Sequence, residues 1–114
     1  MNEAGALVVA DVWLSRWVGD DRVEAAFTDA VGRAGMTVVG TVRHAFTPHG
    51  LTSILLLAES HAAIHTYPER RYVSVDVYTC GPNGAPEAAV RAMMSALPVE
   101  RATVRTISRG EDAP

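Results

Sequence analysis

Apolar positions recur along this chain at helical spacing in two segments, which predict two amphipathic helices. In residues 23–34 they follow the i, i+3, i+4 spacing of a single helix face. Asp20 or Asp21 is expected to cap this helix, and Gly35 is expected to end it. A second stripe of the same kind covers residues 90–97 and stops before Pro98.

Between and around these helices the pattern is typical of strands. The run ILLLA predicts a strand that is buried on both faces, because it contains no polar position. Residues 72–80 alternate instead, with Val73, Val75, Val77 and Thr79 on one face. A turn is expected over 67–71 and another over 81–84, and a frayed tail over 109–114. The predicted strands cover residues 5–13, 36–46, 51–59, 61–66, 72–80 and 101–108.

The resulting order, β-α-β-β-β-β-α-β, predicts a single α+β domain over residues 1–114. We expect a two-layer α/β sandwich, in which both helices cover one face of a largely antiparallel sheet. If the helices take the valine face, the opposite face carries Ser74, Asp76, Tyr78 and Cys80. A face that mixes polar and aromatic groups in this way favours either solvent or a second sheet as its neighbour.

Composition limits the classes of function. With 114 residues, 48% apolar and 20% charged, the chain has the composition of one globular domain. A net charge of −3 without a basic cluster argues against nucleic acid as a partner. No apolar stretch approaches the roughly twenty residues that a membrane span needs, and no positive segment precedes the first apolar run. The single cysteine fits a reducing compartment, so a cytoplasmic location is expected.

All ten basic residues are arginines, and the chain contains no lysine. Pyridoxal phosphate enzymes hold their cofactor as a Schiff base on a lysine. That cofactor is therefore excluded. An enzyme of this sequence that decarboxylates amino acids needs another electrophile.

Candidate chemistry is concentrated in residues 46–81, which contain Ser60, His65, Asp76 and Cys80. Ser60 and Cys80 taken singly could be an ordinary strand-end hydroxyl and a small buried thiol. A zinc site is disfavoured, because the H-x3-H spacing of His61 and His65 lies in extended chain rather than on a helix. A serine hydrolase is disfavoured as well, since the G-x-S-x-G motif is absent.

Four motifs in this block nevertheless occur together: P-H-G, L-A-E-S-H, I-H-T-Y-P-E and V-D-V-Y-T-C-G. In their order and spacing the chain resembles the short bacterial and archaeal S-adenosylmethionine decarboxylase proenzymes. It departs from the family pattern at four places. Ala6 and Leu7 replace the rest of an opening G-x-H, Ser53 stands for a glycine, Tyr67 for a tryptophan and Pro82 for an acidic residue.

The resemblance implies self-cleavage between Glu59 and Ser60 into a β chain, 1–59, and an α chain, 60–114. Ser60 would become a pyruvoyl group, the covalent cofactor that forms a Schiff base with the substrate, and no metal is implied. His65 and Thr52 would support processing, and Cys80 would donate the proton that replaces carbon dioxide. The family also implies a homodimer in which two sheets pack face to face with the active sites between them.

Three functions remain open on the sequence. The first is S-adenosylmethionine decarboxylase, which serves spermidine biosynthesis, and the second is a pyruvoyl-dependent decarboxylase of arginine or ornithine. The third is a catalytically silent regulatory subunit. A cationic substrate would favour acidic contacts, and an adenosyl group would favour aromatic ones. The candidate substrate-binding residues of these two kinds are Asp11, Glu69 and Asp76, and Phe46 and Tyr67.

Overall fold

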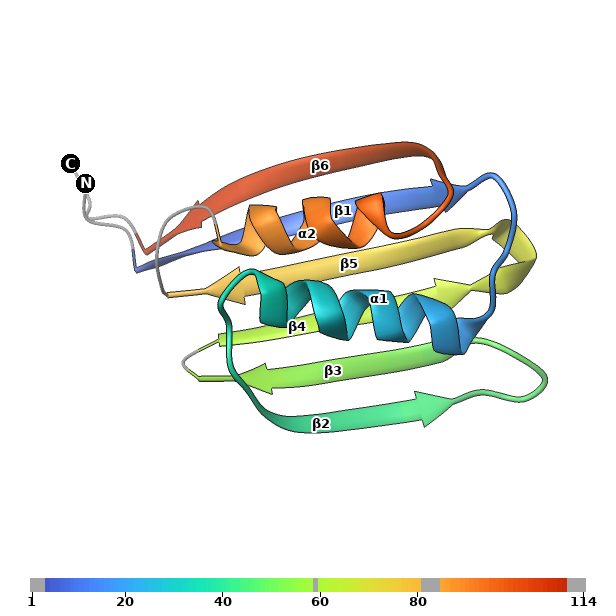
Figure 1. The fold of residues 1–114 in the computed structure, drawn as a ribbon. Helices are drawn as coiled ribbons and strands as arrows, with labels where there is room; N and C mark the ends of the chain where they lie inside the picture. Colours follow the sequence, from blue (N-terminus) through green and yellow to red (C-terminus); the bar gives the residue numbers. More distant parts are fainter. Residues whose placement is uncertain (1–3, 59, 81–84, 111–114) are drawn as a thin grey trace.

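A computed structural model describes residues 4–58, 60–80 and 85–110 of the chain. The helices and strands follow one another in the predicted order, and within these described ranges a short 3-10 helix is added in the predicted turn before the fifth strand (Figure 1). They are β1 (Gly5–Leu14), α1 (Asp20–Arg33), β2 (Val38–Ala45), β3 (Leu51–Leu57), β4 (Ser60–Tyr67), η1 (Pro68–Arg70), β5 (Tyr72–Thr79), α2 (Ala85–Ser95) and β6 (Val99–Arg109).

The strands form one six-stranded sheet in the order β2-β3-β4-β5-β1-β6. Every neighbouring pair is antiparallel. The strands from β2 to β5 follow one another as a meander, whereas β1 is inserted between β5 and β6. The predicted α+β sandwich with an antiparallel sheet is therefore confirmed.

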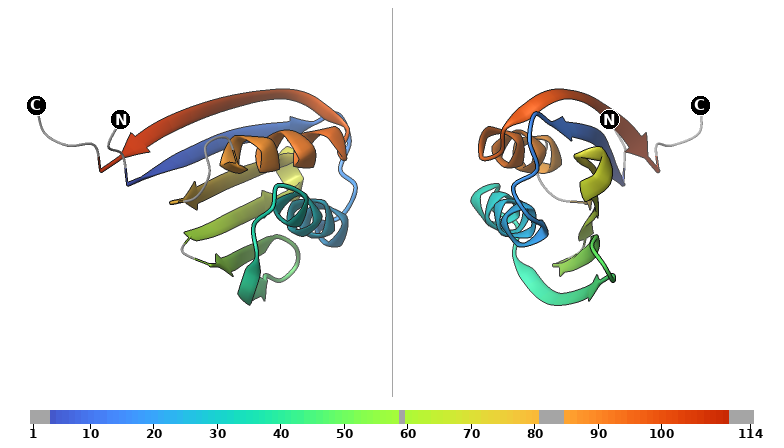
Figure 2. Two further views of the ribbon diagram at one scale, coloured as in Figure 1. Left: turned by 60° about the vertical axis from the view of Figure 1, so that its left-hand side comes forward. Right: turned by 90° about the vertical axis from the view of Figure 1, so that its right-hand side faces the viewer.

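Both helices lie side by side on one face of the sheet, and no described helix covers the other face (Figure 2). We call the uncovered side the open face. The core fills the space between the helices and the sheet. On β5 it includes Val73, Val75 and Val77, as their alternation predicted, and from the helices it includes Phe27 and Met93.

The ends of α1 differ in how well the sequence predicted them. The N-cap residue is Gly19, and no side chain caps the helix, so the capping role expected of Asp20 or Asp21 is wrong. Gly35 ends the helix as expected. Its φ is 87°, its N–H bonds to Gly32 O, and the next N–H, of Met36, bonds to Val31 O. This pair of bonds is the Schellman arrangement, which requires a left-handed residue.

Strand bounds shift by up to two residues from the prediction. The second strand begins at Val38 rather than at residue 36, because the Met36 N–H is used by the end of α1. The third strand ends at Leu57, and the last one is longer than predicted at both ends. The fourth begins at Ser60 and includes Tyr67. The predicted turn at 81–84 and residues 111–114 of the predicted tail lie outside the described residues.

The expectation that β3 is buried on both faces is wrong for the chain by itself. Leu51, Leu55 and Leu57 are buried under the helices, but Ile54 and Leu56 on the open face are 41% and 58% exposed. A strand of this composition normally has cover on both sides. The exposed side chains therefore make the open face unusually apolar for a surface.

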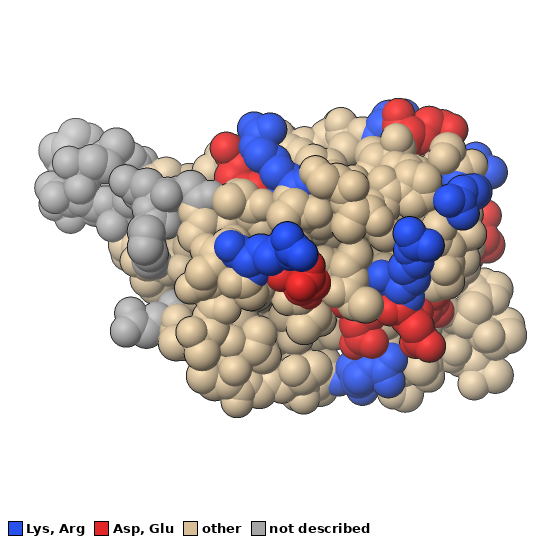
Figure 3. All heavy atoms as spheres, viewed as in Figure 1, with Lys and Arg blue, Asp and Glu red and all other residues tan. Residues whose placement is uncertain are grey.

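Charged residues of both signs are interspersed on the helix-covered side of the molecule (Figure 3). One group joins Arg43 of β2 to Asp21 and Glu24 of α1. Within the described ranges, neither helix is long and apolar enough to span a membrane.

Candidate active site

Side chains of the open face are arranged in rows, because neighbouring strands pair in a continuous register. Thr52 of β3 lies opposite His65 of β4, which in turn lies opposite Ser74 of β5. The full row through these residues, across all strands of the sheet, is His44, Thr52, His65, Ser74, Asp11 and Thr103.

At one end of the open face, Thr52 and His65 form a hydrogen-bonded pair. The distance from Thr52 Oγ1 to His65 Nδ1 is 2.8 Å. The two side chains lie next to a pocket of about 390 Å³, a size that suits a small-molecule substrate. We call this region the His65 end. The pocket is lined by Phe46, His49, Gly50, Leu51, Thr52, His65, Thr66, Tyr67 and Glu69.

The pocket combines aromatic surface with one carboxylate. Phe46 and Tyr67 are 52% and 40% exposed, so their rings are open to a ligand. Glu69 Oε1 lies 3.2 Å from His49 Nε2 at the same rim. Aromatic faces and a carboxylate can together hold a flat base and a positive charge. Three of the five predicted substrate-binding residues, Phe46, Tyr67 and Glu69, therefore meet at this pocket.

The other end of the same strands carries Ser60 and Cys80, and we call it the Ser60 end. Ser60 begins β4 and pairs with Thr79 of β5, so Cys80, the residue after Thr79, lies at the same end of the neighbouring strand. Among the described residues, the Ser60 hydroxyl donates one long bond, 3.4 Å, to Ala58 O. The predicted cleavage bond joins Ser60 to Glu59, and Glu59 lies outside the described residues.

Tyr78 connects Cys80 to strand β1. The distance from Cys80 Sγ to Tyr78 Oη is 4.0 Å, and hydrogen bonding to Cys80 is the main cause that raises the pKa of Tyr78. The tyrosine ring lies against Gly5, where a Cβ would come within 2.7 Å of both Tyr78 Oη and Thr79 O. Only glycine leaves room at this position. Gly5, predicted only as the start of a strand, therefore lets Tyr78 reach the thiol.

The structure does not bring the two ends together within one chain. Ser60 and His65 are five residues apart on an extended strand, which separates them by about 16 Å. An odd separation also turns their side chains to opposite faces. Ser60 shares its face with buried Ala62 and Ile64, whereas His65 lies on the open face. In a single chain the predicted processing residues are therefore divided between the Ser60 end and the His65 end.

Two predicted substrate contacts lie elsewhere. Asp11 accepts a hydrogen bond from the Tyr72 hydroxyl and a long one, 3.4 Å, from Thr103. Asp76 is exposed on the open face, in register with Val9 and Ala63. Neither carboxylate lines the pocket at the His65 end.

Next to Asp11, an aromatic row crosses three strands. The centroid of the Tyr72 ring lies 5.3 Å from that of Tyr67 and 5.2 Å from that of Trp13. The Arg101 guanidinium completes the row, 3.9 Å above the Trp13 ring. This distance is well within the range of a cation–π contact. The row joins the rim of the pocket to strand β6.

Tyr72 gives a prediction for alkaline pH. Burial, followed by the hydrogen bond to Asp11, raises the pKa of Tyr72 from 10.0 to about 12. As pH rises the unfolded state loses this proton first, so the contribution of Tyr72 to stability is complete below pH 10 and is lost towards pH 12. Tyr72→Phe should cost about 1 kcal/mol at neutral pH and flatten this decline. Urea unfolding at several pH values measures both effects. Tyr67→Phe is the control and should keep the decline, whereas a Tyr72→Phe curve parallel to wild type would contradict the prediction.

Histidine spacing also bears on the zinc alternative. His61 and His65 lie on the same face of β4 but four residues apart, which separates them by about 13 Å. That is too far for both to bind one metal ion. In the described ranges, no group of three His, Cys, Asp or Glu side chains is placed to hold a metal.

Sequence reasoning missed two contributors to the site. The sequence assigns no role to His49 beyond its place in the P-H-G motif, and the structure pairs it with Glu69 at the pocket. The sequence places Tyr78 on the open face without a role in the chemistry. No pattern in the sequence indicates its contact with Cys80, which depends on the space above Gly5.

Known proteins are similar to this chain in sequence and in fold. The sequence profile of S-adenosylmethionine decarboxylase matches residues 14–110. A proenzyme of that name from Methanococcus maripaludis strain C5 is 34% identical, over 96% of this chain and 93% of its own length. A proenzyme of the same name from Parasynechococcus marenigrum is 41% identical over 76% of this chain and 68% of its own length. The crystal structure of the Aquifex aeolicus adenosylmethionine decarboxylase superposes with a TM-score of 0.85 at 29% identity, covering 99% of this chain and 96% of that one. The chain belongs to the S-adenosylmethionine decarboxylase family.

Proposed function

We propose that this protein is a pyruvoyl-dependent S-adenosylmethionine decarboxylase that matures by cleaving itself between Glu59 and Ser60. The observation that carries the proposal is the register of β4 with β5, which pairs Ser60 with Thr79, the residue before Cys80. The nucleophile and the thiol therefore lie at the same end of adjacent strands, although they are twenty residues apart in the sequence. Membership of the family supports the same activity.

Maturation begins with the side chain of Ser60. Its Oγ attacks the carbonyl carbon of Glu59, and the peptide bond is replaced by an ester. Removal of the Ser60 α-proton then expels the Glu59 carboxylate and frees the β chain, 1–59. Hydrolysis of the remaining dehydroalanine releases ammonia and leaves a pyruvoyl group at the start of the α chain, 60–114. Each step needs a group that moves a proton, and the Thr52–His65 pair is suited to that task.

The mature site has distinct tasks for its residues. The pyruvoyl group supplies the electron sink that decarboxylation of an amino acid requires. The Cys80 thiol is suited to act as a general acid that delivers a proton to the substrate carbon. At the pocket, Phe46 and Tyr67 offer stacking surface to an adenine, and Glu69 offers a charge opposite to that of a sulfonium.

We further propose that the working unit is a homodimer joined through the open faces. The exposed apolar side chains Ile54 and Leu56 support this proposal. The two-fold axis would lie in the interface and cross the strands at right angles. Such an axis places the His65 end of each copy against the Ser60 end of the other, and so joins the halves that a single chain keeps apart. Ser60, whose peptide bond to Glu59 would be cleaved, begins β4 at the Ser60 end.

The experiment that tests the activity is intact mass under denaturing conditions, followed by carbon dioxide release. Wild-type protein should give two fragments divided between Glu59 and Ser60, the second with a pyruvoyl terminus. S-adenosylmethionine should be decarboxylated faster than arginine or ornithine. A higher rate with arginine or ornithine would favour the alternative that the acidic residues Glu69 and Asp76 allow. One uncleaved mass that persists would support a silent regulatory subunit.

The role of Cys80 gives a separate prediction. Cys80→Ala should still cleave, because the thiol takes no part in the ester shift. Decarboxylation should fall by about 10² to 10⁴-fold, the usual contribution of a general acid, or give product protonated at the wrong atom. Fragment masses, carbon dioxide release and the mass of the product measure the three effects. An unchanged rate, or a precursor that no longer cleaves, would contradict the assigned role.

A further inference from the structure

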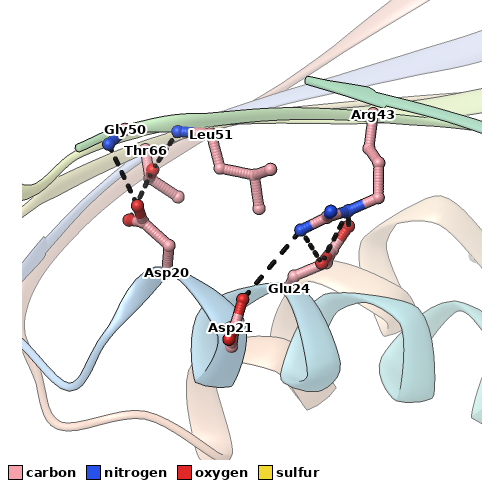
Figure 4. Close-up of polar contacts among 7 residues, drawn as sticks. All are labelled: Asp20, Asp21, Glu24, Arg43, Gly50, Leu51 and Thr66. Carbon is pink, nitrogen blue, oxygen red and sulfur yellow. Dashed lines mark hydrogen bonds and ion pairs between the residues drawn. The ribbon is translucent and has the colours of Figure 1, made fainter. Parts of the chain in front are cut away.

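A carboxylate on the helix-covered side of the sheet lies directly behind the Thr52–His65 pair. Asp20, the first residue of α1, accepts hydrogen bonds from the Gly50 N–H at 3.0 Å and from the Thr66 hydroxyl at 2.8 Å. The Thr66 oxygen in turn accepts one from the Leu51 N–H at 2.8 Å. Figure 4 shows these bonds converging on the start of β3. We call this set of four residues the Asp20 clamp.

The clamp begins where the backbone ladder between β3 and β4 ends. Thr52 and His65 form the last backbone pair of that ladder. At the next position the Leu51 N–H is bound by the side chain of Thr66, which is only 5% exposed. The Thr66 side chain thus replaces the next backbone hydrogen bond of the ladder, at a strand end that would otherwise be prone to local opening.

The clamp also restricts the residues on both sides of the pair. Leu51 immediately precedes Thr52, and Thr66 immediately follows His65. Gly50 is buried and has a φ of 103°, so the chain enters β3 through a conformation that only glycine adopts easily. Bonds to an ionised carboxylate are stronger than neutral ones, and a negative charge is favoured at a helix N-terminus. Helix α1 therefore holds this corner of the sheet firmly.

We propose that Asp20 is a positioning residue for self-cleavage, which acts through Thr66 and Leu51 on the geometry of the Thr52–His65 pair. This inference rests on the proposed function, because it gives that pair a reaction to perform. Asp20 does not touch the reacting atoms. It fixes, from the opposite side of the sheet, the hydrogen bond that orients the His65 ring, and a misplacement of about 1 Å is costly in such a site.

The same helix offers a matched control. Glu24, four residues after Asp20, accepts bonds from the Arg43 guanidinium of β2 at 2.9 to 3.2 Å. This ion pair also ties α1 to the sheet, and it holds the pKa of Glu24 below its usual value. The hydrogen bonds of Glu24 go to Arg43 rather than to the residues of the Asp20 clamp (Figure 4). Asp20→Asn and Glu24→Gln both replace a carboxylate by an amide of the same shape. The two variants therefore compare directly the two sets of hydrogen bonds that join α1 to the sheet.

The test uses the full-length precursor with the variants Asp20→Asn, Glu24→Gln, Thr66→Val and Thr66→Ser. Cleavage is followed by intact mass against time, and stability by urea unfolding. The ring nitrogens of His65 are followed by ¹⁵N NMR in all variants at the same pH. Asp20→Asn and Thr66→Val should cleave about ten- to a hundredfold more slowly and shift the Nδ1 resonance. Glu24→Gln and the hydroxyl-retaining Thr66→Ser should stay within about twofold of wild type.

Two results would overturn the proposal. One is that Asp20→Asn cleaves at the rate of Glu24→Gln, and the other is that it slows while the His65 resonances stay in place. If Asp20→Asn does not fold, the comparison of Thr66→Val with Thr66→Ser decides in the same way. If wild-type protein does not cleave at all, the proposed function fails, and the shift of the His65 resonances alone decides whether Asp20 positions the ring.

Discussion

Ser60→Ala should yield one uncleaved chain with no decarboxylase activity. The alanine has no hydroxyl to attack the Glu59 carbonyl, and it cannot become a pyruvoyl group. Activity should fall by more than about 10³-fold, because nucleophile and electrophile are lost in one substitution. Intact mass and carbon dioxide release from S-adenosylmethionine measure the two losses.

Ser95→Ala is the control for this experiment. The Ser95 hydroxyl only donates to Arg91 O within α2, so its removal should leave cleavage and activity unchanged. The fold of the Ser60→Ala chain should match wild type in urea unfolding, since within the described ranges the Ser60 hydroxyl makes one long hydrogen bond. Decarboxylation that depends on a pyruvoyl group in this variant would contradict the mechanism.

Two inactive variants should restore cleavage when they are produced together. Ser60→Ala lacks the nucleophile and His65→Ala lacks the proton-transfer group, so neither should cleave alone. In a mixed dimer joined through the open faces, the Ser60 end of one copy lies against the His65 end of the other, and at one of these two junctions both residues are intact. With random assembly, half of the dimers are mixed and each has one complete site, so about a quarter of all chains should cleave. Mass spectrometry should find every α fragment carrying the His65→Ala change.

The control mixes Ser60→Ala with Thr52→Val, which removes the partner of His65 from the same end of the face. Cleavage should reappear there too, in the Thr52→Val chain. If the mixtures stay uncleaved although mixed dimers have formed, Ser60 and His65 must act within one chain. The separation of about 16 Å along β4 would then have to close by a movement of the strand.

Much of the fold could be predicted from the sequence because its signals are local. Helical spacing of apolar residues placed α1, and the alternation of Val73, Val75 and Val77 correctly assigned the core face of β5. The family resemblance also implied a shared task for Thr52 and His65, and these two residues do meet. In each case the information lies in a period of two or 3.6 residues or in a short motif.

Features that depend on the register between strands were less predictable. That Ser60 and His65 are kept apart follows from their positions along one extended strand, which motif spacing alone does not reveal. Asp20 was predicted as a helix cap because its type and position suit that role. Its carboxylate instead bonds to Gly50 and Thr66, thirty and forty-six residues away in the sequence. Rules that consider only neighbouring residues in the sequence cannot predict hydrogen bonds to such distant partners.

The strand order of the sheet determines what the proposed self-cleavage would do to the molecule. After a cut before Ser60, β1, β2, β3 and α1 belong to one fragment, and β4, β5, β6 and α2 to the other. In the order β2-β3-β4-β5-β1-β6 these fragments interleave, since β1 of the first lies between β5 and β6 of the second. The two products are therefore bonded along three strand boundaries rather than one. They should remain associated without a covalent link, and after denaturation their reassembly becomes a bimolecular reaction that depends on concentration.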